Sequence, residues 1–202
     1  MVDYSIENEY REKGFNIICG VDEAGRGPLA GPVYAAAVIL PSDCVIEGLN
    51  DSKKLTEKKR EKLFDEIKDK ALAYGIASAD EKEIDEINIL NATFLAMKRA
   101  INSLSVKPDL ALIDGNQKPH TDIEEVTVIK GDAKSMSIAA ASVLAKVSRD
   151  RFMLEMAEKY PQYEFARHKG YGTKLHYEKI AQYGVCDIHR RTFLKKILGE
   201  QK

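Results

Sequence analysis

Four acidic residues stand beside apolar segments in a pattern that indicates a metal-dependent active site. Asp22 and Asp114 each directly follow a short apolar run, and Glu23 follows Asp22. Asp132 lies between another apolar run and a long apolar helical pattern. Because sites in open α/β sheets form at strand ends, where loops converge, we expect these carboxylates to meet. Gathered carboxylates repel one another unless a cation compensates, and a set without His or Cys favours Mg²⁺ or Mn²⁺ over zinc.

Each of these acids, considered alone, could instead have a purely structural role. Carboxylates also cap helices and close turns, and Asp132 precedes a helix, where an anion is favourable without any metal. Neighbouring side chains on a regular strand point to opposite faces, so Asp22 and Glu23 reach one site only if the chain bends. Gly25 supplies such a bend. The occurrence of the acids together at predicted strand ends favours the metal site.

The turn after the first two acids combines two glycines with an arginine. In Gly25-Arg26-Gly27 the glycines let the main chain touch a ligand, and Arg26 offers a forked donor to a phosphate or sugar. A plain tight turn explains the glycines equally well. Lys53 and Lys54 are a second candidate for phosphate contact, although adjacent lysines are more often a solvated surface.

A tyrosine between two glycines is a candidate platform for a nucleic-acid base. Tyr171 lies between Gly170 and Gly172, and Lys169 and Lys174 flank it. Aromatic faces stack on bases and sugars, whereas a single loop tyrosine often binds nothing. The basic and glycine-rich surroundings favour a binding role.

The histidines and cysteines indicate no metal centre of their own. The four histidines lack metal-ligand spacing, and we expect surface or hydrogen-bonding roles for them: His120, His168, His176 and His189. The three cysteines are widely spaced, which excludes a disulfide framework and a zinc ribbon and indicates free thiols in a reducing compartment.

The hydrophobic pattern that must position these residues predicts an α/β domain with one sheet. Apolar runs predict four or five strands, over residues 17–21, 32–40, 71–78, 110–113 and 126–129. Helical patterns cover residues 5–13, 56–69, 80–86, 87–104, 135–159, 174–183 and 192–198. Thr56 is a plausible N-cap. The first half of 135–159 is apolar or small on all sides, which indicates a buried helix in close contact with a neighbour.

Length and composition fit one globular domain, or one domain with a small appendage. The chain has 202 residues, of which 44% are hydrophobic and 31% charged. The longest apolar run, 33–40, is far shorter than the roughly 20 residues that cross a bilayer, and no secretory signal is evident. We therefore expect a cytoplasmic protein without a membrane partner. Residues 1–129 carry a net charge of −8 and residues 130–202 one of +7, which favours a polyanionic partner for the C-terminal part.

Six motifs follow one another in the order of a known family. They are D-E-A-G-R-G-P-L-A-G-P-V at 22–33, D-S-K-K-L at 51–55, I-D-G-N at 113–116, K-G-D-A-K-S-M-S-I-A-A-A-S-V-L-A-K-V-S-R-D at 130–150, H-K-G-Y-G-T at 168–173 and C-D-I-H-R-R-T-F at 186–193. Together they resemble ribonuclease HII, the type 2 ribonuclease H, of bacterial type, over nearly the whole chain. One departure is Val185, where we expect a proline.

The resemblance implies an RNase H-like fold, with a mixed central sheet flanked by helices and a C-terminal helical segment. We expect a helical lead-in over 1–16, a catalytic domain over 17–160 and a substrate-binding helical segment over 161–202. The implied activity is endonucleolytic hydrolysis of the RNA strand of RNA–DNA hybrids. It includes cleavage 5′ of a single ribonucleotide in duplex DNA, giving 5′-phosphate and 3′-hydroxyl ends.

The resemblance also implies roles for individual residues. The catalytic and metal-binding set, with two Mg²⁺ or Mn²⁺ ions, is Asp22, Glu23, Asp114 and Asp132. The substrate-binding set is Gly25, Arg26 and Gly27, which sense the ribose 2′-hydroxyl, Tyr171, which stacks at the RNA–DNA junction, and Lys53 and Lys54, which contact phosphate. Hybrids and ribonucleotide-containing duplexes are the implied partners; the C-terminal end shows no evident clamp-binding peptide, and a monomer is expected.

Three rival interpretations are less consistent with the residues. Ribonuclease HIII carries a large additional N-terminal domain and a different glycine turn. A non-catalytic hybrid-binding module does not need four acids at strand ends. A DNA-only nuclease of the same fold does not need the turn over 25–27, and cleavage of an all-DNA duplex would favour it.

Overall fold

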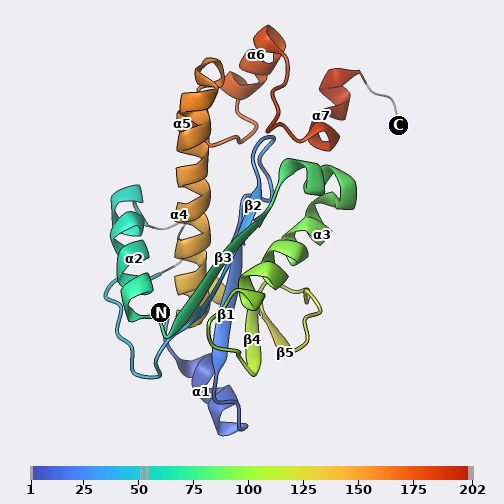
Figure 1. Cartoon of the computed structure of the whole chain (residues 1–202). Coiled ribbons are helices and arrows are strands. Elements are labelled where there is room, and N and C mark those ends of the chain that lie inside the picture. Colours follow the sequence, from blue (N-terminus) through green and yellow to red (C-terminus); the bar gives the residue numbers. More distant parts are fainter. Residues whose placement is uncertain (1, 51, 53–54, 200–202) are drawn as a thin grey trace.

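The apolar runs form five strands of one mixed sheet (Figure 1). A computed structural model describes residues 2–50, 52 and 55–199, with the side chains of 196–198 excepted. The strands, in the sheet order β3-β2-β1-β4-β5, are β1 (Ile18–Ala24), β2 (Val33–Ile39), β3 (Ala73–Ala79), β4 (Leu110–Asp114) and β5 (Glu124–Val128). The first three pair antiparallel, whereas β4 pairs parallel with both β1 and β5. The mixed sheet agrees with the expected fold.

Helices cover both faces of this sheet. They are α1 (Ser5–Glu12), α2 (Glu57–Lys70), α3 (Glu81–Asn102), α4 (Met136–Lys159), α5 (Phe165–His168), α6 (Lys174–Tyr183) and α7 (Arg191–Leu198). One apolar core joins α3 to the sheet, and a second joins α2 and α4 to the opposite face. Figure 1 shows α5 and α6 near the C-terminal end of α4, whereas α7 lies towards the start of α3, where Asp85 accepts from the amides of Arg191 and Thr192. None of the helices in the described ranges is long and apolar enough to cross a membrane.

Local hydrogen bonds explain where the main helices begin. The Thr56 side chain accepts from the Lys59 amide, as the N-cap prediction requires, and Ser135 caps α4 in the same way. Asp80 and Glu83 form a capping box at the start of α3. Asn88 interrupts α3 with a φ of 68°, close to the expected boundary between two helices at residue 87.

Small residues let α4 lie directly on β1. A Cβ on Gly20 would stand 2.1 Å from the backbone carbon of Ser137, so only glycine fits at this crossing. The three alanines Ala139, Ala140 and Ala141 are completely buried. The prediction of an enclosed helix in close contact with a neighbour is therefore confirmed, and this contact fixes α4 beside the first two acids.

Two strand boundaries differ from the prediction. β1 continues three residues beyond Val21, because β2 pairs with it as far as Ala24 opposite Tyr34. Asp22 and Glu23 therefore lie inside the strand rather than after it. β5 begins at Glu124, before the predicted start, because its pairing with β4 begins there, with Glu124 opposite Leu110. The carboxylate of Glu125 accepts from the amides of residues 120 and 121, which satisfies this buried acid.

Candidate active site

Parallel pairing of β1 and β4 brings the first and third acids together. Val21 lies opposite Ile113, so Asp22 and Asp114 occupy the next positions on neighbouring strands. Asp22 is only 4% exposed, and Asp114 is partly buried. Burial raises the pKa of Asp22 well above its ordinary value, and the negative charges of Glu23 and Asp114 raise it further. This carboxylate is therefore placed where a cation would be stabilising.

A backbone amide next to the fourth acid, Asp132, is hydrogen-bonded to the third acid, Asp114. Asp132 is buried in a 3₁₀ helix, Gly131–Ala133, between β5 and α4. The amide of Gly131 donates to Oδ1 of Asp114 at 2.6 Å. A Cβ on Gly131 would stand 3.2 Å from the same oxygen, so glycine keeps this approach open. The loop that carries Asp132 is thereby fixed against the end of β4.

A cavity of about 210 Å³ opens beside Asp22. Its described lining residues are Asp22, Glu23, Ala24, Gly25, Arg26, Ser52, Ser142, Lys146 and Tyr171. Five residues singled out from the sequence thus share one cavity. Gly27 is exposed and is not among the described residues that line the cavity. Lys53 and Lys54 lie outside the described residues.

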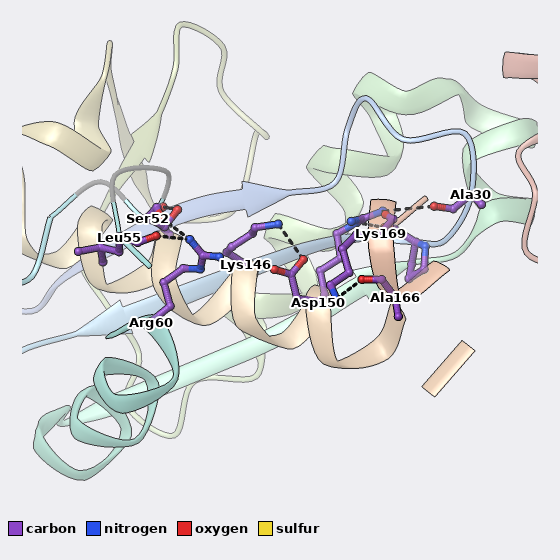
Figure 2. Close-up of polar contacts among 11 residues, drawn as sticks. Ala30, Ser52, Leu55, Arg60, Lys146, Asp150, Ala166 and Lys169 are labelled. Carbon is purple, nitrogen blue, oxygen red and sulfur yellow. Dashed lines mark hydrogen bonds and ion pairs between the residues drawn. The ribbon is translucent and has the colours of Figure 1, made fainter. Parts of the chain in front are cut away.

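Two polar residues of this cavity, Ser142 and Lys146, were not singled out from the sequence. Ser142 bonds to Ser52 with 2.7 Å between their oxygens, and Lys146 pairs with Asp150 at 2.7 Å (Figure 2). Ser142 and Lys146 are four residues apart on α4 and therefore face the same side. That spacing, in the mostly apolar first half of the helix, was the signal available in the sequence.

Two cations stand near the acids and the tyrosine. Arg26 pairs with Glu23 at 3.4 Å, and half of the Arg26 side chain is exposed. The Lys146 ammonium lies 6.0 Å from the centre of the Tyr171 ring. Both cations are therefore placed to meet a phosphate that approaches this cavity.

A completely buried arginine holds the glycine turn from behind. Arg190 donates to the carbonyls of Gly25, Arg26 and Gly31 at 2.6, 2.9 and 2.8 Å. Burial lowers the pKa of its guanidinium to about 9. Gly25 has a φ of 97°, and a Cβ there would stand 2.0 Å from Nε of Arg149. The conformation of the turn thus requires glycine at position 25, and the hydrogen bonds from the Arg190 guanidinium hold it in place.

A second buried arginine connects this region to the tyrosine loop. Arg149 donates to the carbonyls of Pro32 and Ala30, and its Nη2 also reaches the carbonyl of Lys169 at 3.0 Å. Its guanidinium carbon lies 5.6 Å from the centre of the Tyr171 ring, and Tyr171 is 43% exposed. The ring therefore lies next to the Arg149 guanidinium and remains partly accessible to a ligand.

The segment that contains Lys53 and Lys54 is anchored at its described ends. Arg60 donates from one nitrogen to the carbonyls of Ser52 and Leu55, at 2.9 and 2.6 Å (Figure 2). The predicted lysines stand between these two anchored positions in the sequence. Their role in phosphate contact stays a prediction.

The chemistry of the donors fits hard divalent cations. All four acids offer oxygen ligands, and no lysine or arginine of the described part of the chain pairs with Asp22 or Asp114. As the side chains stand, the described residues contain no group of three acids, histidines or cysteines close enough to hold an ion. Carboxylates held near one another repel, so an ion at this site would be stabilising and would require the side chains to approach one another more closely.

Comparison with known proteins supplies the family. A model of the family described as ribonuclease HII matches residues 19–196. Ribonuclease HII of Caldicellulosiruptor bescii is 58% identical over 97% of this chain and 95% of its own length. Ribonuclease HII of Acetivibrio thermocellus is 61% identical over 95% of this chain and 75% of its own length.

A solved structure supports the same relationship. The ribonuclease H2 of Pyrococcus horikoshii superposes with a TM-score of 0.75 at 31% identity, covering 92% of this chain and 97% of that one. The sequence resemblance and the expected fold are both confirmed by these matches. The chain therefore belongs to the ribonuclease HII family, endoribonucleases that cleave the RNA of RNA–DNA hybrids.

Proposed function

We propose that this chain also cuts at a single ribonucleotide embedded in duplex DNA, on the 5′ side of that residue. Water adds to the phosphorus, and the bond from phosphorus to the preceding 3′-oxygen breaks. The ribonucleotide keeps a 5′-phosphate, and the preceding nucleotide gains a 3′-hydroxyl. One observation carries the proposal: Asp22, Gly25, Arg26 and Tyr171 line the same cavity.

The four acids are proposed to hold two Mg²⁺ or Mn²⁺ ions. Asp22 and Asp114 are the shared ligands, and Glu23 and Asp132 complete the two sites. When bound, such a pair of ions activates the attacking water and stabilises the leaving oxygen. The chain itself supplies a buried position for Asp22, and the Gly131 amide orients Asp114 from the side of the Asp132 loop.

The turn at Gly25, Arg26 and Gly27 is proposed to recognise the ribose 2′-hydroxyl. This hydroxyl is the group that distinguishes RNA from DNA, and it can donate and accept a hydrogen bond. Arg190 binds the carbonyls of Gly25 and Arg26 and thereby fixes the turn before a substrate arrives. A turn held in one conformation binds its ligand more tightly than a mobile one, because no ordering cost falls on binding.

Tyr171 is proposed to stack on the substrate at the junction between RNA and DNA. Its ring is partly exposed next to Arg149 and Lys146, whose positive charges favour an approaching phosphate backbone.

The basic C-terminal part, 161–202, is the proposed substrate-binding segment, with the catalytic domain over 17–160 and a lead-in over 1–16. We also propose that the chain acts as a monomer on cytoplasmic nucleic acid and that Lys53 and Lys54 contact phosphate.

A series of duplexes that differ in one sugar tests the proposal. The central position carries ribose, deoxyribose or 2′-O-methylribose in an otherwise identical DNA duplex. We expect a nick 5′ of the ribose and none at the other two sugars, while a continuous RNA–DNA hybrid is cut as the positive control. Cutting at the deoxyribose position would show that the turn does not read the 2′-hydroxyl.

A further inference from the structure

Three buried histidines meet behind the loop that carries Tyr171. His168, His176 and His189 are 7%, 0% and 3% exposed, although histidines of unknown role were expected at the surface or in hydrogen bonds. The rings of His168 and His176 stack with 4.3 Å between their centres. Nε2 of His176 and Nε2 of His189 are 3.1 Å apart. The surface expectation is wrong for these three and the hydrogen-bonding one is right.

The backbone fixes the direction of each hydrogen bond in this cluster. The amide of Cys186 donates to Nδ1 of His189 at 2.9 Å, so that nitrogen carries no proton and Nε2 of His189 carries it. His189 then donates to Nε2 of His176. The remaining proton of His176 is on Nδ1, which donates to the carbonyl of Tyr171 at 3.0 Å.

The third histidine follows the same logic. The amide of Gly170 donates to Nδ1 of His168, so Nε2 of His168 donates to the carbonyl of Tyr163 at 2.9 Å. All three rings are thus neutral, and each has one defined tautomer. The rings of Tyr163 and Phe165 and the thiol of Cys186 complete the described surroundings of the cluster.

The cluster connects two parts of the proposed substrate contact. Its far end is at residues 186–189, directly before Arg190, whose fork holds the glycine turn. Its near end is the Tyr171 carbonyl. The histidines therefore set the tyrosine loop in register with the turn over 25–27, in addition to the contact of Arg149 with the Lys169 carbonyl.

We propose that His176, oriented by His189, is a positioning residue that fixes Tyr171 relative to the glycine turn for cleavage at single ribonucleotides. The inference rests on the proposed stacking role of Tyr171. A single ribonucleotide offers one productive register, whereas a continuous hybrid offers many, so loss of positioning reduces cleavage mainly at the single site.

Two substitutions separate positioning from simple packing. In His176→Asn the amide nitrogen replaces Nδ1 and can still donate to the Tyr171 carbonyl. In His176→Gln the amide reaches the place of Nε2, which keeps the contact with His189 and leaves the Tyr171 carbonyl without its donor. His120→Asn, at an exposed histidine, is the matched control.

The measured quantity is the rate at a single ribonucleotide divided by the rate on a continuous hybrid. We expect His176→Asn and His120→Asn to stay within about twofold of the wild type and His176→Gln to lose roughly tenfold, the effect of one hydrogen bond. Equal losses in the Asn and Gln variants would overturn the proposal. If Tyr171→Ala leaves the ratio unchanged, the stacking role itself is wrong. If Tyr171→Ala lowers it and His176→Gln does not, only the positioning role is wrong.

A spectroscopic readout on the wild-type protein does not depend on how the variants fold. Long-range proton–nitrogen NMR spectra of labelled histidines report which ring nitrogen carries the proton. We expect His176 to be protonated at Nδ1, and His168 and His189 at Nε2, at pH 7. A His176 ring protonated at Nε2 alone would leave the Tyr171 carbonyl without its donor, and a doubly protonated ring could not accept the bond from His189. Either result would refute the proposal.

Discussion

Replacing Asp22 by Asn should remove cleavage and yet make the metal-free protein more stable. Asp22 is buried and faces the charges of Glu23 and Asp114, which raise its pKa together with burial. Oδ1 of Asp22 accepts from the Glu23 amide at 2.7 Å, and an asparagine oxygen can keep that bond. The substitution therefore removes a repelled charge while the hydrogen bond from the Glu23 amide stays.

The spacing of the sheet sets the size of the effect. Neighbouring strands lie about 4.8 Å apart, and two unit charges at that distance repel by about 3 kcal/mol at an effective dielectric constant of about 20. Asp114 is only partly buried, so solvent screens part of this repulsion. We expect a gain of about 1–3 kcal/mol, or about 3–9 °C in melting temperature for a chain of this size.

The pH dependence of stability tests the sign of this change independently. A carboxyl whose folded-state pKa is raised stabilises the fold fully below its unfolded pKa and less as pH rises through the folded value. The melting temperatures of wild type and Asp22→Asn, measured in chelator, should therefore differ at pH 7.5 and converge towards pH 4. Adding Mg²⁺ should raise the wild-type melting temperature more than that of the variant. A less stable variant at pH 7.5, or equal responses to Mg²⁺, would refute the reasoning.

Three further predictions follow from the site. Tyr171→Ala should impair nicking at a single ribonucleotide more than cleavage of a long hybrid; equal losses in parallel gel assays would contradict stacking at the junction. Arg190→Lys keeps a charge but lacks the planar guanidinium that donates to three carbonyls. Urea melts should therefore show a loss of about 2 kcal/mol in the free energy of unfolding, and nicking at a single ribonucleotide should fall as well. Unchanged nicking would show that Arg190 does not support recognition of the ribonucleotide through the turn. Burial lowers the pKa of His176 and His189 to about 4, below the unfolded value, so stability should be full above about pH 6.5 and decline as pH falls towards 4. Thermal melts should show a smaller decline in His176→Asn, and the same decline in both proteins would contradict the neutral cluster.

The sequence was most informative where one physical rule dominates. Short apolar runs located all five strands, and the small residues of α4 predicted a close contact with a neighbour, which the structure shows to be β1. The positions of Asp22 and Asp114 beside apolar runs indicated site residues, because burying a carboxylate is unfavourable unless a cation or hydrogen bonds compensate its charge. The parallel pairing that makes them neighbours was not predictable from either segment alone, because it depends on which strands meet.

Residues that act through the backbone of another segment escaped the sequence analysis. Arg149 and Arg190 are completely buried and hold carbonyls more than one hundred positions away in the chain. No local pattern distinguishes such an arginine from one on the surface, where most arginines lie. The histidine cluster escaped for the same reason, because stacking of His168 on His176 and the link to His189 arise only when α5, α6 and the segment before α7 come together.

The most direct test of the account is metal-dependent nicking at one ribonucleotide by the wild type and Asp114→Asn. The substrate is a labelled DNA duplex with a single ribonucleotide, assayed in Mg²⁺, in Mn²⁺ and in chelator, with circular dichroism to verify the fold of each protein. The account predicts a single nick 5′ of the ribonucleotide for the wild type with either ion, none in chelator and none for the folded variant. Unchanged turnover by Asp114→Asn in Mg²⁺, or cleavage by the wild type in chelator, would contradict the assignment of the carboxylates as a metal site.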